Sequence, residues 1–93
     1  MNISIIGAGN MARGIGTRFV TGGNAVTIAG KDQVKATALA QDLRSGKPGA
    51  DVTVATVDAA LANPIIVLAL PFAAARDFAA ANAAKLAGKV VVD

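Results

Sequence analysis

The feature that most constrains the fold is a glycine-rich segment, residues 7–12, directly after an almost continuously apolar run at residues 2–6. Such a run of β-branched side chains predicts a strand buried on both faces of a parallel sheet. The segment reads Gly-Ala-Gly-Asn-Met-Ala. In it Gly7 would make a tight turn, Gly9 would let an anion approach the backbone, and Ala12 would let a helix lie close to the strand. Free N–H groups at the start of that helix favour a pyrophosphate, so the segment predicts a dinucleotide-binding unit.

The rest of the chain alternates predicted strands with predicted helices. We expect strands at residues 2–6, 25–29, 52–54, 65–70 and 90–92, and helices at about 10–21, 32–45, 56–62 and 71–88. Parallel strands joined by right-handed crossovers give an α/β fold, a doubly wound sheet of order 3-2-1-4-5 with helices on both faces. Such sheets bind ligands beyond the carboxyl ends of their strands, which places the site among residues 7–12, 30–32 and 69–72.

Length and composition limit the kinds of domain, site and partner that this chain can have. A chain of 93 residues predicts one domain, residues 1–93, without a separate substrate domain. Cys, His, Tyr and Glu do not occur, so we expect no metal site, and no residue can be assigned as catalytic. Scattered basic residues with few aromatic ones predict no nucleic-acid partner, and no apolar run is long enough to span a membrane. We therefore expect a cytoplasmic protein, and we interpret the terminal Asp93 as solvated.

The end of the second predicted strand bears on the choice between NAD and NADP. NAD-specific domains place Asp or Glu there, where it bonds both ribose hydroxyls. This chain has Gly30 and Lys31 instead, with Lys35 one helical turn later, so two lysines can flank a 2′-phosphate. Asp32 keeps the alternative open, because it lies where an NAD-selecting acid could occur, although it also suits a helix N-cap. We expect NADP(H), with two merely exposed lysines as the alternative.

The first predicted helix contains two glycines that need an explanation. Gly14 and Gly16 should each destabilise it by about 0.5–1 kcal/mol relative to Ala. We interpret both as positions of close packing between helix and sheet. Arg13, in the first turn, could reach a phosphate or be solvated, and the sequence favours neither.

Three segments together resemble a known family. Residues 7–12, residues 26–31 with Lys35, and Leu-Ala-Leu-Pro-Phe at residues 68–72 are similar to the N-terminal domain of NADPH-dependent deazaflavin-coenzyme reductases. Pyrroline-carboxylate reductases and the cytosolic domain of membrane ferric reductases contain similar domains. The resemblance extends over essentially the whole chain. It implies a Rossmann-like domain that binds NADP(H) and an oxidoreductase that transfers hydride between NADPH and a deazaflavin or flavin.

The resemblance also implies the site residues. The pyrophosphate turn would be formed by Gly7, Ala8, Gly9, Asn10 and Met11, the 2′-phosphate site by Gly30, Lys31 and Lys35, and the nicotinamide ribose site by Ala69, Leu70, Pro71 and Phe72. The family often has hydroxyl residues at the positions of Ala8 and Gly30, so two hydrogen bonds to the 2′-phosphate would be missing.

Family members also continue past the fifth strand into a helical domain that completes the substrate pocket and often the dimer. We expect this domain to be absent from the chain, which would need a partner domain or a second copy. The alternative is a non-catalytic nucleotide-binding module or a subunit of a larger complex.

Overall fold

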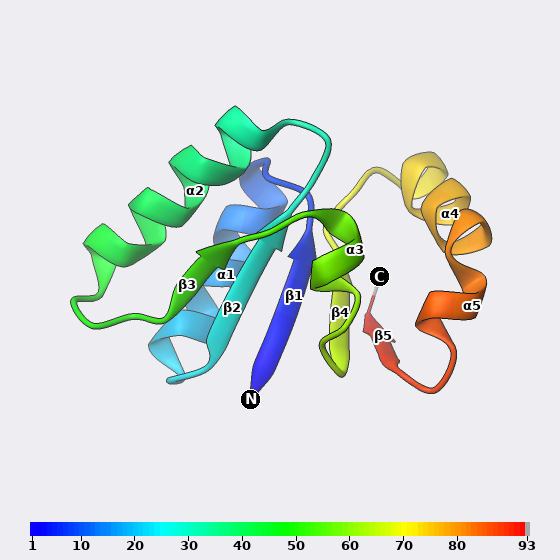
Figure 1. The fold of residues 1–93 in the computed structure, drawn as a ribbon. Coiled ribbons are helices and arrows are strands. Elements are labelled where there is room, and N and C mark those ends of the chain that lie inside the picture. Colours follow the sequence, from blue (N-terminus) through cyan, green and yellow to red (C-terminus); the bar gives the residue numbers. More distant parts are fainter. Residues whose placement is uncertain (93) are drawn as a thin grey trace.

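Residues 1–92, the part of the chain that the computed structural model describes, form a sheet of five parallel strands (Figure 1). The strands are β1 (Asn2–Ile6), β2 (Ala25–Ala29), β3 (Val52–Val54), β4 (Ile65–Leu68) and β5 (Val90–Val92). Their order is β3-β2-β1-β4-β5, and every neighbouring pair is parallel. The predicted doubly wound, Rossmann-like sheet is therefore confirmed.

Helices cover both faces of this sheet. One face is covered by α1 (Asn10–Thr21) and α2 (Gln33–Gly46), and the other by α3 (Val57–Ala60), α4 (Phe72–Ala81) and α5 (Ala83–Leu86). Successive side chains of a strand point to opposite faces, so β1 sends Ile3 and Ile5 toward α1 and α2, and Ser4 and Ile6 toward α3. None of the helices described is long and apolar enough to cross a membrane.

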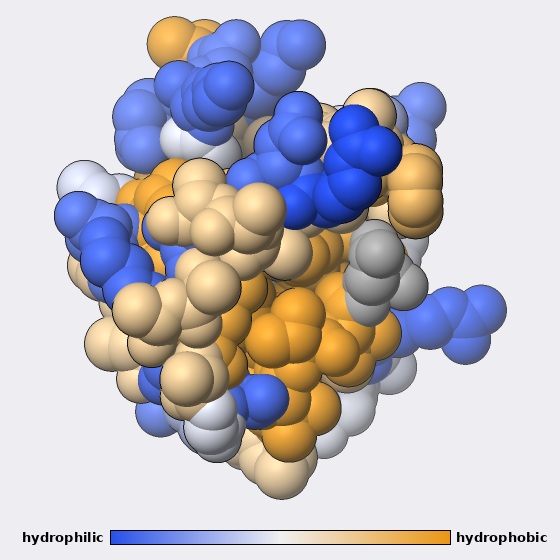
Figure 2. All heavy atoms as spheres, turned by 90° about the vertical axis from the view of Figure 1, so that its right-hand side faces the viewer, coloured by the Kyte–Doolittle hydropathy of each residue, from blue (hydrophilic) through white to orange (hydrophobic). Residues whose placement is uncertain are grey.

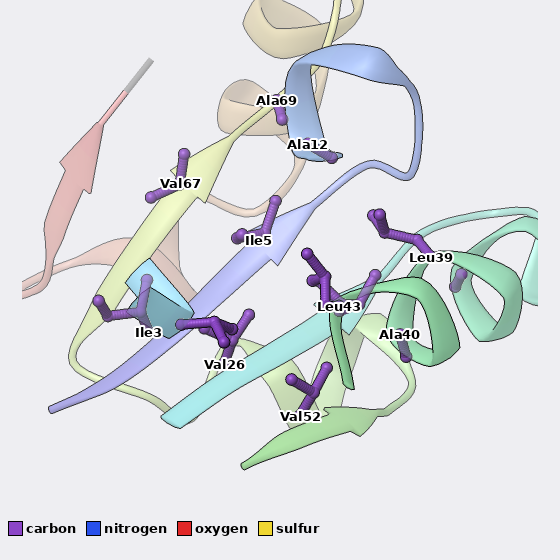
Figure 3. Packing of buried hydrophobic residues seen from close by; sticks show 13 residues of the cluster. Ile3, Ile5, Ala12, Val26, Leu39, Ala40, Leu43, Val52, Val67 and Ala69 are labelled. Atoms are coloured by element: carbon purple, nitrogen blue, oxygen red, sulfur yellow. The ribbon is translucent and has the colours of Figure 1, made fainter. Parts of the chain in front are cut away.

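The core under α1 and α2 is built from small aliphatic side chains (Figure 3). Four buried residues of α2 contribute to this core, and their spacing places them on one face of the helix: Ala36, Leu39, Ala40 and Leu43. Gly16 of α1 lies so close to this layer that an added Cβ would stand 2.9 Å from Cδ1 of Leu43. Close packing is thus confirmed for Gly16.

At Gly14 the packing interpretation is wrong. This glycine is exposed, and no atom lies within 4 Å of the position that a Cβ would take. Gly14 and Gly16 are two positions apart in the helix, so they project from different sides of α1. Packing against the sheet therefore explains one glycine and leaves the other without a structural reason.

A buried polar network fixes the second face. The hydroxyl of Ser4, which is fully buried, donates to the carbonyl oxygen of Ala60 at 2.6 Å. The side-chain amide of Asn63 donates to Ser4 Oγ at 2.9 Å and to Thr27 Oγ1 at 3.3 Å. These bonds tie the end of α3 and the following turn to β1 and β2. They therefore hold α3 against the middle of β1 and β2.

Two predicted elements end earlier than expected. The predicted strand at residues 65–70 stops at Leu68, although the Ala69 N–H still donates to the Ile6 carbonyl at 2.9 Å. The predicted helix at residues 71–88 is two helices, α4 and α5, separated at Asn82. The Asn82 side chain donates to the Phe78 carbonyl at 2.9 Å, and such side-chain bonds to the backbone compete with helix continuation.

Smaller differences between the predicted and the observed structure concern α3 and the start of α4. The helical stretch predicted at residues 56–62 is a single turn, α3, in which the Ala59 N–H donates to the Thr56 hydroxyl. Phe72 begins α4, and its side chain is exposed.

Candidate functional site

A cleft of about 720 Å³ lies at the carboxyl ends of β1 and β2, where a doubly wound sheet binds its ligands. The turn after β1 and the start of α2 form one side, and α3 and α4 form the other. The cleft brings together seven of the residues predicted from the sequence: Gly7, Ala8, Gly9, Gly30, Lys31, Lys35 and Leu70. Three segments that are far apart along the chain therefore meet where the sheet topology predicts.

The turn after β1 is fixed against its neighbours. The N–H of Gly7 donates to the Ala29 carbonyl at the end of β2, at 2.8 Å. Gly7 has a φ of +125°, and a Cβ at this position would overlap the carbonyl oxygen of Ala69 after β4. By contrast, no atom lies within 4 Å of a Cβ added to Gly9. The fold itself requires a glycine at position 7, whereas the space beside Gly9 remains open to a ligand.

The first turn of α1 has no side-chain cap. Gly9 is its N-cap residue and supplies no side-chain acceptor, and the first turn contains no acidic residue. The next helix differs, because Oδ1 of Asp32 accepts a hydrogen bond from the Lys35 backbone N–H at 3.1 Å. The first N–H groups of any α-helix lack intrahelical acceptors. Since α1 begins at the cleft, these groups can meet an anion there.

Two lysines line the cleft where the chain passes from β2 into α2. Lys31 and Lys35 are exposed, and within the described part of the chain neither takes part in an ion pair. Asp32 lies between them and also lines the cleft, and its interpretation as a helix N-cap is confirmed. Positive charge therefore collects at the end of β2.

Of the two alternatives that the sequence left open for Arg13, contact with a phosphate and exposure to solvent, the structure agrees with exposure. Its guanidinium Nη1 lies 2.8 Å from Oδ2 of Asp42 on α2, and both side chains are about half exposed. The pair joins α1 to α2 on the outside of the fold. Arg13 therefore does not line the cleft.

The remaining predicted residues border the cleft without lining it: Asn10, Met11, Ala69, Pro71 and Phe72. Ala69 is buried beneath Gly7, while the side chains of Met11 and Phe72 are exposed in the first turns of α1 and α4. Both helices begin at the carboxyl end of the sheet. The ligand contacts of these five residues stay predictions.

Sequence reasoning missed the second side of the cleft. It is formed by Val57 on α3 and by residues on or next to α4, namely Ala74, Asp77, Phe78, Ala81 and Asn82. Ala74, Phe78 and Ala81 recur at i, i+4 and i+7, which places them on one helix face. That spacing is visible in the sequence. Phe78 packs partly against the second core and partly lines the cleft.

Comparisons with known proteins agree with this geometry. The model of the family described as NADP oxidoreductase coenzyme F420-dependent matches residues 2–93. The solved structure of an imine reductase from Bacillus cereus BAG3X2 is similar, with a TM-score of 0.74 and 26% sequence identity. The match covers 97% of this chain and 30% of that one, so this chain spans less than a third of the enzyme's length. The comparison with curated proteins finds no match. Both similarities support an oxidoreductase domain that binds NAD(P).

Proposed function

Because the chain belongs to the family described as NADP oxidoreductase coenzyme F420-dependent, we propose that its cleft holds NADP(H) for hydride transfer between NADPH and a deazaflavin or flavin. One observation carries the proposal. A single cleft joins the uncapped start of α1 to two lysines, Lys31 and Lys35, that have no ion-pair partner within residues 1–92. NADPH carries its negative charge in two places, the pyrophosphate and the 2′-phosphate, and the cleft offers a positive site for each.

The proposed position of the cofactor follows from these two sites. The first turn of α1 would donate N–H groups to the pyrophosphate, which can approach because Gly9 has no side chain. Lys31 and Lys35 would hold the 2′-phosphate, and each charge-assisted hydrogen bond is worth about 1.5–3 kcal/mol. The apolar side chains of Val57 and Phe78, across the cleft, suit an adenine ring.

The opposite end of the cofactor would then lie near the residues after β4. Leu70 lines the cleft, and Pro71 and Phe72 follow it at the start of α4. The bound cofactor supplies the hydride, so the protein has to position two rings and to exclude water. This requirement agrees with a cleft whose titratable side chains are limited, among the residues described, to two lysines and two aspartates.

A second candidate function is a non-catalytic nucleotide-binding module, or a subunit that needs a partner. The observation that favours it is the lining of the cleft, whose titratable side chains, among the described residues, are two lysines and two aspartates. On this alternative the cleft binds NADPH, and hydride transfer requires groups that the chain does not supply.

The experiment that separates the candidates has two stages. The first stage titrates the protein with NADPH and follows the fluorescence of the bound nucleotide. The second adds a deazaflavin, a flavin or a cyclic imine and follows the loss of NADPH absorbance, with Gly9→Ala as a control for direct reaction in solution. We expect binding, followed by oxidation with the deazaflavin or the flavin above the control rate. Binding without transfer to any acceptor would favour the second candidate, and no binding would refute both.

A further inference from the structure

The side of the cleft that α3 and α4 form carries polar side chains to which the proposed function gives no role. Figure 2 shows the molecule from the side of α4 and α5, where apolar side chains cover much of the surface. Between residues 72 and 82 only Arg76, Asp77 and Asn82 have polar side chains, and of these Asp77 and Asn82 line the cleft. A ligand in the cleft therefore meets, on α4, apolar groups and two side chains that contain hydrogen-bond acceptors.

The side-chain amide of Asn82 is held in one orientation. Its Nδ2 donates to the Phe78 carbonyl at 2.9 Å, and only the amide nitrogen, not the oxygen, can bond to a carbonyl. Asn82 is also the N-cap residue of α5, where the oxygen of an asparagine usually accepts a hydrogen bond from the helix. Here the side chain makes no such capping bond. Within residues 1–92, Oδ1 of this partly buried residue is therefore an acceptor that the chain itself does not use.

Asn82 lies at the end of the cleft that is remote from the phosphate sites. The helix α4 begins at the carboxyl edge of the sheet, where Lys31 and Lys35 also lie, and Asn82 follows its last residue. Asn82 comes one helical turn after Phe78, on the same face of the helix. In the proposed position of the cofactor, the adenine ring lies against Phe78 with its ribose toward the lysines. The 6-amino group, on the edge of adenine opposite the ribose, then points along α4 toward Asn82.

We propose that Asn82 selects the base of the cofactor, with its Oδ1 accepting a hydrogen bond from the 6-amino group of adenine. The inference rests on the proposed function and adds a residue that recognises the base to those that hold the phosphates. Adenine has an N–H donor at this position, whereas hypoxanthine has an oxygen there. Because Nδ2 is bonded to Phe78, the amide cannot turn to offer a donor to that oxygen. The cleft should therefore discriminate against a dinucleotide that contains hypoxanthine.

Asp77 is the other acceptor on α4, and the structure favours it less. Its side chain is 78% exposed, and its Oδ1 lies 3.7 Å from Nε of Arg76. An exposed carboxylate is already hydrated, so exchanging water for a neutral amino group contributes little. Its negative charge also opposes the approach of a ligand that carries phosphates. We therefore assign recognition of the base to Asn82, and Asp77 provides the comparison.

Fluorescence titration with NADPH, and with its analogue that contains hypoxanthine in place of adenine, tests the proposal. Both nucleotides contain the same fluorescent dihydronicotinamide, and the readout is the ratio of their dissociation constants, which a general loss of structure does not change. Asn82→Ala removes the acceptor, Asn82→Asp keeps an oxygen but loses the bond to Phe78, and Asp77→Ala removes the other acceptor. Circular dichroism shows whether each variant is folded. Asn82→Gly takes the place of Asn82→Ala if the alanine variant is not, because glycine accepts a break between two helices.

We expect the unmodified chain to bind NADPH about tenfold more tightly than the analogue, as the loss of one hydrogen bond predicts. Asn82→Ala should bring the ratio close to one, while Asn82→Asp and Asp77→Ala should keep most of the preference. Equal binding of both nucleotides by the unmodified chain would overturn this inference and leave the proposed function standing. A ratio that Asn82→Ala does not change, or that Asp77→Ala abolishes, would also overturn it. Failure to bind either nucleotide would refute the proposed function, and this inference with it.

Discussion

Replacing Gly7 by alanine should destabilise the fold strongly, whereas the same change at Gly9 should leave the fold intact. Gly7 combines a φ of +125° with a direct overlap between the new Cβ and the carbonyl oxygen of Ala69. A strained backbone conformation of this kind costs about 1–3 kcal/mol. Displacing a packed neighbour adds about 1–3 kcal/mol. Together these effects predict a loss of about 2–6 kcal/mol in the free energy of unfolding.

That loss is large for a domain of this size. Domains are stable by about 0.05–0.15 kcal/mol per residue, or roughly 5–14 kcal/mol for this chain. Each kcal/mol shifts the melting temperature of such a domain by about 4–8 °C, so Gly7→Ala should lower it by roughly 10 °C or more. Gly9 has a φ of −88°, and no neighbour lies within 4 Å of its Cβ position. The Gly9→Ala variant should therefore melt within a few degrees of the unmodified chain.

Thermal unfolding followed by circular dichroism, with NADPH binding measured in parallel, checks both halves of this prediction. Gly9→Ala should remain folded and lose affinity for NADPH, because the new methyl group enters the space proposed for the pyrophosphate. The reasoning would be refuted if Gly7→Ala melted at the temperature of the unmodified chain. It would also fail if Gly9→Ala lost as much stability as Gly7→Ala.

Three further substitutions test separate parts of the account by urea unfolding. Gly14→Ala should stabilise the protein by about 0.5–1 kcal/mol, since Gly14 is exposed within α1, and an unchanged or lower stability would contradict this. Ser4→Ala should destabilise it by about 1–3 kcal/mol, because the buried Ala60 carbonyl and the Asn63 amide each lose a partner; no loss would mean that the network is dispensable. Asp32→Ala should remove about 1 kcal/mol of capping energy without weakening NADH binding, whereas a selective loss of NADH affinity would restore its NAD-selecting role.

Most of the fold was predictable because the sequence pattern is consistent at every level. Short β-branched runs mark each strand, and the helix between β2 and β3 begins at a capping residue, Asp32. The break at Asn82 was not predictable, since alanines on both sides favour a continuous helix; at the break the Asn82 side chain donates to the Phe78 carbonyl. Local propensity thus located the elements, and a side-chain bond to the backbone accompanies the end of α4.

Only half of the candidate site was predictable, for a different reason. The turn after β1 and the lysines after β2 follow strands directly, so sheet topology alone places them at the carboxyl edge. The other half depends on how α4 crosses that edge, which sets whether Phe78 faces the core or the cleft. The pairing of Arg13 with Asp42 likewise required the packing of α1 against α2. Contacts between helices are therefore where the sequence pattern is least informative.

The ratio of the dissociation constants for NADH and NADPH, measured by titration calorimetry, tests the central claim most directly. Lys31→Ala should weaken NADPH binding by about 10- to 100-fold and leave NADH binding nearly unchanged, because only NADPH carries the 2′-phosphate. Arg18→Ala is the matched control, since it removes an exposed positive charge from the far end of α1, away from the cleft. We predict a clear preference for NADPH that Lys31→Ala abolishes and Arg18→Ala preserves. Equal affinity of the unmodified chain for both nucleotides would contradict the account.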